Sequence, residues 1–392
     1  MFSLLKTLTR LPLGERFVPI FAIVLLIGAS GSGAMAQVLE TKAKQAFMID
    51  VSTGTVLLEK NADERMPTAS MSKIMTMYML FEALKEGRIS LDDTLPVSER
   101  AWRKGGSKMF VEVGDRIRVE DLMRGVIVQS GNDASIVVAE GLAGSEDAFA
   151  IQMTERALEL GLANSNFRNA TGWPDPDHYS TARDLALLAY RIMTDFPEYY
   201  RYYSEPEFTY NDITQANRNP LLYRDMGADG LKTGHTEEAG YGLTASAIRG
   251  DRRIILVVNG LSSVAERSEE TERVMSWGFR EFDTFLLKRA GETVETAASW
   301  MGSPDDVPLV MDRDLRVTLR RSEHDQVQAS IRVQQPLTAP IARGTRVATL
   351  VLTAPSTPPQ EYPLFAGVEV ERKGFAGRVF QALGHIALGA LN

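Results

Sequence analysis

Three short motifs hold the side chains of this sequence that are best suited to covalent chemistry. In chain order they are Ser70-Met-Ser-Lys73, Ser130-Gly-Asn132 and Lys232-Thr-Gly234. At average residue usage, a Ser-x-x-Lys motif is expected about once in a chain of this length, and Ser3-Leu-Leu-Lys6 also matches. Each of the other two motifs is expected in fewer than about one such chain in ten. The three together, in this order, predict a serine nucleophile served by a lysine base.

Ser70 and Lys73 are three residues apart, a spacing that places both side chains on one face of a helix. A serine hydroxyl is a weak nucleophile until a base takes its proton. Lysine can be that base only when it is neutral, and burial and nearby cations such as Lys232 favour the neutral form. A helix start at Ser70 also supplies backbone N–H groups for an oxyanion. The alternative is that Ser70 is an N-cap and Lys73 a solvated residue.

Ser130 and Asn132 are predicted to lie in a turn between two helices. A hydroxyl there can pass a proton to a leaving amine, and the amide can bind a peptide carbonyl of the substrate. Serine, glycine and asparagine are also good turn formers, so an ordinary turn is the alternative interpretation.

Lys232 and Thr233 precede a predicted strand over 241–248. They present a cation and a hydroxyl to an anionic group, and Gly234 allows a substrate backbone to approach closely. The alternative is a surface loop with a solvated lysine. Arg218 is a candidate second partner for a carboxylate, and an ordinary surface arginine is the alternative there.

The elements that position these motifs follow from hydrophobic periodicity and turn residues. Strands are predicted at both ends of a mainly helical segment, which implies an α/β first domain with a helical cluster inserted in the sheet connectivity. From about residue 291 the chain changes to short alternating strands with Pro and Gly turns, typical of a small all-β sandwich domain. We expect strands at 46–50, 55–59, 240–248, 253–259, 316–320, 329–333 and 347–352, helices at 70–85 and 268–287, and helix–turn–helix at 119–144.

Residues 1–36 are predicted to be an export signal. The segment has a basic start, an apolar run too short to span a membrane comfortably, and a small-x-small cleavage site at Ala34-Met-Ala36. An uncleaved N-terminal anchor is the alternative. We therefore place domains at 37–288 and 291–371 of an exported, periplasmic protein.

Residues 372–392 are predicted to form an amphipathic helix that follows the β-rich domain. Its apolar residues recur every three or four positions, and Arg372, Lys373 and Arg378 lie near its start. This pattern favours an in-plane anchor on the outer face of the cytoplasmic membrane. A terminal helix docked on its own protein is the alternative.

Composition excludes several classes of partner and cofactor. The chain has 392 residues and a net charge of −8, which makes a nucleic-acid partner improbable. It contains no cysteine, so disulfides, a thiol nucleophile and cysteine-based metal sites are excluded. The four histidines lack the spacing of a zinc site, and no cofactor is expected.

Longer strings around the motifs resemble a known family. The set is similar to the serine penicillin-recognising enzymes with a β-lactamase/transpeptidase-like fold, and in particular to the low-molecular-weight D-Ala-D-Ala carboxypeptidases of peptidase family S11. The resemblance runs from about Lys42 to the C-terminus. One departure is Ala170-Thr-Gly-Trp-Pro, where Gly-Leu-Pro is expected. The strings are Pro67-Thr-Ala-Ser-Met-Ser-Lys73, Gly106-Ser-Lys-Met-Phe110, Gln129-Ser-Gly-Asn-Asp-Ala134, Asp229-Gly-Leu-Lys-Thr-Gly-His-Thr236 and Ala339-Pro-Ile-Ala-Arg-Gly344.

The resemblance implies a role for each motif residue in the removal of D-alanine from peptidoglycan stem peptides. Ser70 would form the acyl-enzyme, Lys73 would be the general base and Ser130 would carry the proton to the departing D-alanine. Lys232 would hold the terminal carboxylate with help from Thr233. The backbone N–H groups of Ser70 and His235 would form the oxyanion hole. β-Lactams would acylate Ser70 and remain bound.

Three other functions share parts of this pattern. A β-lactamase of the most similar class needs a Glu-x-x-Leu-Asn loop, and no such string occurs here. A DD-endopeptidase uses the same three motifs but commonly lacks the second domain. A non-catalytic wall-binding protein would show a broken motif, and all three motifs are intact.

Overall fold

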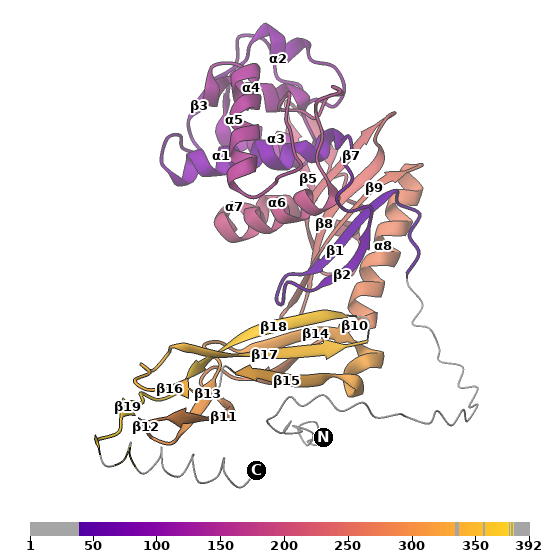
Figure 1. Ribbon diagram of the computed structural model, residues 1–392. Helices are drawn as coiled ribbons and strands as arrows, with labels where there is room; N and C mark the ends of the chain where they lie inside the picture. The colour runs from indigo at the N-terminus through magenta and orange to yellow at the C-terminus, as the bar shows by residue number, and fades with distance from the viewer. Residues whose placement is uncertain (1–38, 334–336, 356, 376, 378, 380–392) are drawn as a thin grey trace, which may run out of the picture. The chain divides into compact units, whose positions relative to one another are not determined.

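The computed structural model describes residues 39–333, 337–355, 357–375, 377 and 379 (Figure 1). It divides between Phe282 and Asp283 into an N-terminal unit, described from Leu39, and a β-rich unit. The predicted export signal and most of the predicted C-terminal helix lie outside the described residues. Among the described helices, none is long and apolar enough to cross a membrane.

The N-terminal unit is built on a five-stranded antiparallel sheet with the order β2-β1-β9-β8-β7. The strands predicted at both ends of this unit are confirmed. The third motif precedes the strand β8, as predicted, but Lys232, Thr233 and Gly234 themselves belong to the edge strand β7, and the alternative of a surface loop is wrong. The strands are β1 (Gln45–Asp50), β2 (Val56–Lys60), β7 (Ala228–Thr236), β8 (Gly240–Arg249) and β9 (Arg252–Leu261).

A helical cluster lies between β2 and β7 in the chain, as predicted (Figure 1). The predicted helix at 70–85 is divided into a 3₁₀ turn and an α-helix, and the helix–turn–helix at 119–144 is confirmed. The helices are η1 (Ala69–Ser72), α1 (Lys73–Lys85), α2 (Glu99–Arg103), α3 (Val119–Ile127), α4 (Asn132–Ala143), α5 (Glu146–Glu159), α6 (Ala182–Asp195), α7 (Pro197–Tyr200), η2 (Arg201–Ser204) and η3 (Pro220–Tyr223). Two short hairpins accompany them, β3 (Thr94–Pro96) with β4 (Arg116–Arg118) and β5 (Glu207–Tyr210) with β6 (Ile213–Ala216).

Alternation along the strands divides the interior of this unit into two cores. Phe47 and Val257 face the helical cluster, whereas Met48 and Leu256 face the other side of the sheet, against α8 (Val264–Glu281). Side chains alternate between the two faces of a strand, so each face carries its own apolar set. Figure 1 shows α8 running along the sheet on the side away from α6. The sheet is therefore covered on both faces.

The prediction of a long helix at 268–287 is wrong at the C-terminal end of that helix. Helix α8 ends at Glu281, and residues Phe282–Lys288 form the strand β10, which pairs with β14 (Leu315–Arg320). The Thr284 and Thr318 hydroxyls lie 2.8 Å apart across this pair. The apolar residues of 282–288 fit both a helical and a strand periodicity. The segment forms a strand because β14, about 30 positions later in the chain, pairs with it.

The β-rich unit contains the six-stranded sheet β15-β17-β18-β13-β11-β16 and the pair β10–β14. Leu315 and Val317 of β14 share a core with Leu350 and Leu364 of the larger sheet, in agreement with the predicted sandwich. Besides β10 and β14, the elements are β11 (Thr293–Trp300), β12 (Gly302–Ser303), β13 (Asp306–Val310), η4 (Arg321–Gln326), β15 (Gln328–Val333), β16 (Leu337–Thr338), β17 (Arg346–Ala354), β18 (Thr357–Ala366) and β19 (Glu371–Arg372).

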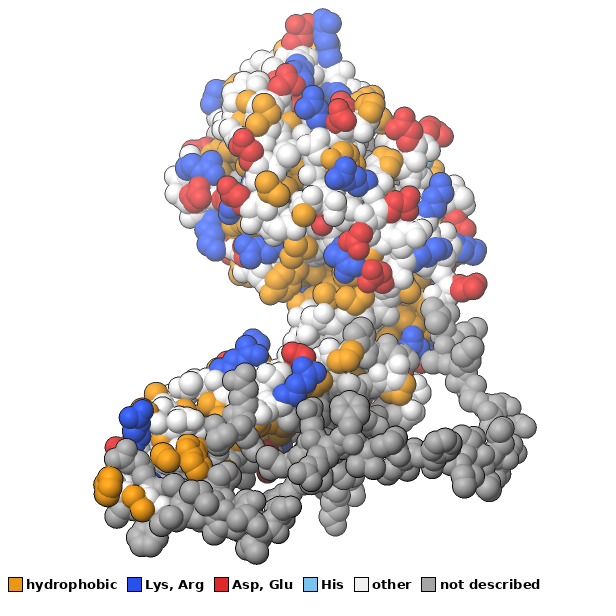
Figure 2. All heavy atoms as spheres, in the orientation of Figure 1, with side chains coloured by type: hydrophobic (Ala, Val, Ile, Leu, Met, Phe, Trp, Pro, Cys, Tyr) orange, Lys and Arg blue, Asp and Glu red, His pale blue; other side chains and the backbone are white. Residues whose placement is uncertain are grey.

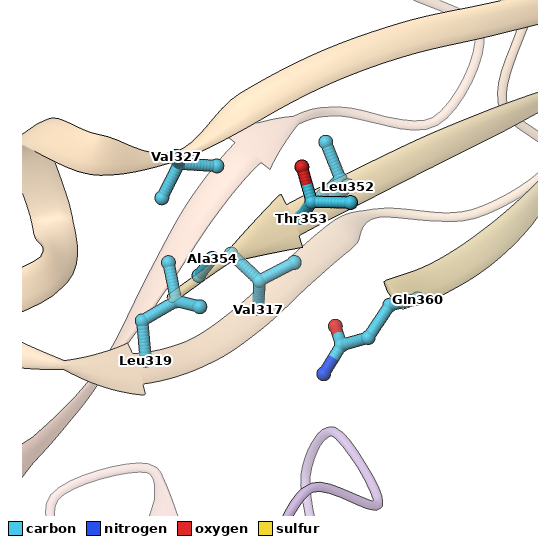
Figure 3. A pocket seen from close by; sticks show the side chains of 7 residues that line it. All are labelled: Val317, Leu319, Val327, Leu352, Thr353, Ala354 and Gln360. Atoms are coloured by element: carbon cyan, nitrogen blue, oxygen red, sulfur yellow. The ribbon is translucent and has the colours of Figure 1, made fainter. Parts of the chain in front are cut away.

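A small cavity of about 10 Å³ lies inside the β-rich unit (Figure 3). Val317, Leu319, Val327 and Leu352 line it with apolar atoms. A volume of about 10–15 Å³ holds a single water molecule at most, and an apolar site does not favour even that. A pocket of this size and lining offers no group for the predicted chemistry, and the residues of the three motifs all belong to the N-terminal unit.

Candidate active site

The candidate nucleophile Ser70 lies in the 3₁₀ turn η1, directly before α1. The Lys73 N–H donates to the Ser70 carbonyl, and the Met71 N–H donates to the Thr68 carbonyl at 3.1 Å. Side chains at positions i and i+3 eclipse one another in a 3₁₀ turn. The ammonium nitrogen of Lys73 accordingly lies 2.9 Å from Ser70 Oγ.

Lys73 is fully buried, and its Nζ has three oxygen neighbours. They are Ser70 Oγ, Asn132 Oδ1 at 2.8 Å and the Thr171 carbonyl at 2.6 Å. Burial, and then the charge of Arg218, lowers the pKa of Lys73 to about 7. Near neutral pH a substantial fraction of the lysine is therefore a neutral amine.

The neutral amine leaves only one arrangement of hydrogen bonds around Lys73. The Thr171 carbonyl can only accept, and Asn132 Oδ1 can only accept because the Nδ2 of the same amide donates to the Gly105 carbonyl at 2.8 Å. The two N–H bonds of the amine satisfy those two acceptors. The nitrogen lone pair is then left facing the Ser70 hydroxyl, which is the orientation that proton abstraction requires.

Asn132 is the first residue of α4, and Ser130 lies two residues before it. The backbone of Ser130 has φ of +60°, which is unusual for a residue with a side chain. Its Oγ is buried and has no hydrogen-bond partner among the described residues. A strained residue with an unpaired buried hydroxyl is costly, and such features concentrate at functional sites.

Asp133, the residue after Asn132, is buried and anchors the neighbouring segment. Its carboxylate accepts from the Met109 N–H at 2.8 Å and the Phe110 N–H at 2.9 Å. The Asn132 N–H donates to the Ser107 carbonyl at 2.8 Å. These bonds hold the segment around Gly106–Phe110, which the sequence strings singled out, against the second motif.

Lys232 and Thr233 are both buried on β7, and the strand passes directly over η1. A Cβ added to Gly234 would lie 2.6 Å from the Thr68 carbonyl oxygen, so only glycine allows this approach. Burial, followed by the charges of Lys73, Arg218 and Arg267, lowers the pKa of Lys232. Four basic side chains thus converge at one end of the site, and an incoming anion would relieve their mutual repulsion.

Arg218 is brought to the site although the sequence left its role open. Its Nη1 donates to Ser107 Oγ at 2.6 Å. Arg267 was missed by the sequence reasoning. It is buried in the first turn of α8 with its Nε unpaired among the described residues. A cation at the positive end of a helix dipole is unfavourable, and that position is the signal that could have identified it.

The ring of His235 is exposed and stacks on Tyr241, with the ring centroids 3.9 Å apart. The backbone of His235 follows Gly234 on β7, next to the close approach to η1. The His235 ring is therefore not part of the buried set of side chains around Ser70.

The segment 169–173 supplies a backbone group that no side-chain motif could reveal. Asn169 Oδ1 accepts from the N–H groups of Gly172 and Trp173 at 2.8 and 2.9 Å, and this loop delivers the Thr171 carbonyl to Lys73. Gly172 has φ of +77°, and a Cβ there would lie 1.8 Å from the Ala69 carbonyl oxygen. The string Ala170-Thr-Gly-Trp-Pro, which departs from the family string, therefore still places a glycine against η1, the turn that contains Ser70.

The arrangement joins a serine nucleophile, a neutral amine base, an unpaired hydroxyl and a set of cations in one site. It is suited to acyl transfer on a substrate with a carboxylate close to the scissile bond. A family model described as D-alanyl-D-alanine carboxypeptidase, peptidase S11, matches residues 32–263. The chain belongs to the peptidase S11 family of D-alanyl-D-alanine carboxypeptidases.

Known relatives of this carboxypeptidase agree along most of its length. It is 40% identical to the D-alanyl-D-alanine carboxypeptidase DacC of Escherichia coli over 91% of this chain and 92% of the relative. It is 36% identical to DacA of Escherichia coli over 86% of both. A second family model, described as the C-terminal domain of penicillin-binding protein 5, matches residues 282–372.

Solved structures confirm the mixed α/β fold of this carboxypeptidase and its C-terminal β domain. Penicillin-binding protein 5 from Haemophilus influenzae superposes with a TM-score of 0.77 at 35% identity, covering 85% of this chain and 99% of that one. Penicillin-binding protein D2 from Listeria monocytogenes in its ampicillin-bound form gives a TM-score of 0.57 at 32% identity, covering 62% and 99%. The protein is a serine-type D-Ala-D-Ala carboxypeptidase.

Proposed function

We propose that this carboxypeptidase releases the terminal D-alanine of peptidoglycan pentapeptides through an acyl-enzyme on Ser70, and that penicillins acylate the same oxygen. The observation that carries the proposal is the distance of 2.9 Å between Lys73 Nζ and Ser70 Oγ, with two further neighbours of Nζ that can only accept. In the neutral amine this arrangement directs the lone pair at the Ser70 hydroxyl. The roles of the remaining residues follow from their places around this pair.

Acylation begins when Lys73 takes the proton of Ser70 and Oγ attacks the carbonyl carbon of the penultimate D-alanine. The oxyanion forms beside the backbone N–H groups of Ser70 and His235, which the close approach of β7 to η1 supports. The C–N bond then breaks. Lys73 returns the proton through Ser130 Oγ, and terminal D-alanine leaves as an amine. Water hydrolyses the ester and frees the shortened peptide and Ser70.

The convergence of cations favours a carboxypeptidase over an enzyme that cuts within a chain. The ammonium of Lys232 lies near Thr233, Arg218 and Arg267, and this group of donors and cations favours an anionic ligand. The free carboxylate of a terminal D-alanine is such an anion. Its binding would restore the pKa of Lys232 and place the scissile bond one residue away. Asn132 would bind the peptide on the acyl side through its amide.

The test uses the protein from residue 37 to residue 371, incubated with a fluorescent penicillin and with an acylated D-Ala-D-Ala peptide. We expect mass spectrometry to locate the penicillin on Ser70, and D-alanine to be released. Ser70→Ala should abolish both. Rapid penicillin hydrolysis without a lasting adduct would instead indicate a β-lactamase. Folded protein with neither adduct nor release would indicate a wall-binding protein.

We further propose that the protein is exported through residues 1–36 and attached to the outer face of the cytoplasmic membrane through residues 372–392. Supporting observations are the basic residues at 372, 373 and 378 and the exposed side chains of Phe375 and Val379. Vesicles containing anionic lipid should retain the chain from residue 37 onward but not its truncation at residue 371. Equal retention of both proteins would contradict the anchor, and an N-terminal sequence beginning at residue 1 in the purified native protein would contradict cleavage.

A further inference from the structure

We propose that Trp173 and Lys104 form a subsite for the side chain that precedes D-Ala-D-Ala, selecting an apolar stem that ends in a carboxylate. This inference rests on the proposed function and specifies its substrate class. The two residues lie outside the three motifs. Trp173 is also the position at which the sequence departs from the family string.

Trp173 is held rigidly beside the amide of the second motif. The Asn169 side chain accepts from the Trp173 N–H at 2.9 Å and donates to its carbonyl at 3.0 Å. A Cβ on Gly106 would lie 3.3 Å from the indole ring and 2.8 Å from Asn132 Nδ2. The ring and the amide therefore border the same glycine.

Trp173 as a whole nevertheless remains 44% exposed. A large aromatic residue that is fixed in place and left open to solvent beside a reactive site is suited to contact with an apolar group. Because Asn132 would bind the acyl side of the substrate, the next group along the peptide reaches Trp173.

Lys104 adds a positive charge to this aromatic surface. Its Nζ lies 4.2 Å from the centroid of the Trp173 ring. No ion pair of Lys104 occurs among the residues that the structure describes. The neighbouring carboxylate of Glu146 is already bound, since Arg100 donates to it at 2.8 Å and the Ala170 N–H at 3.2 Å.

A half-buried ammonium without a carboxylate partner favours an anionic ligand and repels a cationic one. Burial lowers the pKa of Lys104, and the nearby charge of Glu146 offsets this effect only in part. A side chain lying across Trp173 would carry its terminal group to this ammonium. We therefore expect the enzyme to discriminate between substrates by the charge of the terminal group of this side chain, and not by the apolar part that lies across Trp173.

The experiment compares three N-acetylated tripeptides ending in D-Ala-D-Ala. Their first residues have equally long linear stems ending in a carboxylate, a methyl group or an ammonium. We expect kcat/KM for D-alanine release to be about two- to fivefold higher for the carboxylate than for the ammonium peptide, the upper range of an exposed ion pair. Lys104→Glu should reverse this order, and Trp173→Leu should lower kcat/KM for all three.

Lys85 provides a matched control, because its ammonium lies 5.5 Å from the Phe196 ring at the far end of α1. Lys85→Met should leave the preference unchanged. An increase in kcat/KM of the Lys104→Glu variant for the ammonium peptide cannot result from misfolding, because misfolding would lower kcat/KM for all three peptides. Equal kcat/KM for the three peptides with the wild-type protein would overturn the subsite, whereas no D-alanine release from any of them would overturn the proposed function.

Discussion

The imidazole of His178 donates from Nε2 to the hydroxyl of Ser72, 2.7 Å away, and Ser72 belongs to the same 3₁₀ turn, η1, as Ser70. The direction follows from the other nitrogen, because Nδ1 accepts from the Arg168 N–H at 3.1 Å and so carries no proton. Ser72 Oγ in turn lies 2.5 Å from Thr68 Oγ1. His178 is buried, and burial lowers its pKa to about 4.

Stability should therefore fall as the pH decreases from about 6.5 toward 4. In that window the unfolded chain binds a proton at His178 that the folded protein excludes, so the stabilisation present above about 6.5 is lost. The loss attributable to His178 is expected to be about 3 kcal/mol. Urea unfolding followed by tryptophan fluorescence, from pH 4 to 8, should give a shallower pH dependence for His178→Asn. Parallel curves for the two proteins would contradict a neutral His178.

Acylation of Ser70 should depend on the ionisation of Lys73. The lowered pKa of about 7 means that the base is neutral above that pH, so the acylation rate should rise with pH through a midpoint near 7. Lys73→Arg keeps the cation but removes the base and should reduce the rate by at least about 100-fold. Stopped-flow acylation by a fluorescent penicillin measures both. A wild-type rate that is flat from pH 5.5 to 8.5 would be inconsistent with Lys73 as the base.

Ser130 should show opposite effects on stability and activity. Ser130→Ala removes a buried unpaired hydroxyl, so the free energy of unfolding should be unchanged or higher by about 1 kcal/mol. Ser130→Gly should add about 1 kcal/mol more, because φ of +60° is unstrained in glycine. Both variants should lose D-alanine release by a similar factor, since both lack the hydroxyl. Retention of full kcat in either variant would rule out the proton relay.

Gly172 should be intolerant of any side chain for a reason beyond its backbone angle. In Gly172→Ala the added Cβ would meet the Ala69 carbonyl at 1.8 Å and displace the nucleophile turn, whereas Gly250 has φ of +63° and open space around it. Gly250→Ala thus measures the conformational cost alone, about 1 kcal/mol. Gly172→Ala should destabilise more than that and slow penicillin acylation. Equal losses of stability, with unchanged acylation, would show that the turn does not depend on this contact.

The chemistry at the site was largely visible in the sequence because it depends on short motifs. The spacing of Ser70 and Lys73 predicted their contact, and the family strings indicated the activity that the comparisons support. The groups that hold Lys73 were not visible. The Thr171 carbonyl is a backbone atom without a side-chain signature, and Arg267 joins the site from a helix about 35 residues after Lys232.

What the sequence alone determined was set by local periods and local chemistry: the strands at both ends of the first unit, the helices between them and the alternating strands of the second. The tertiary structure decided the rest. Residues 282–288 became a strand because β14 offered backbone partners, and the third motif entered β7 because β8 pairs with it. The lowered pKa of Lys73 likewise depends on burial and on charges brought from distant segments, and neither is encoded within any one window of sequence.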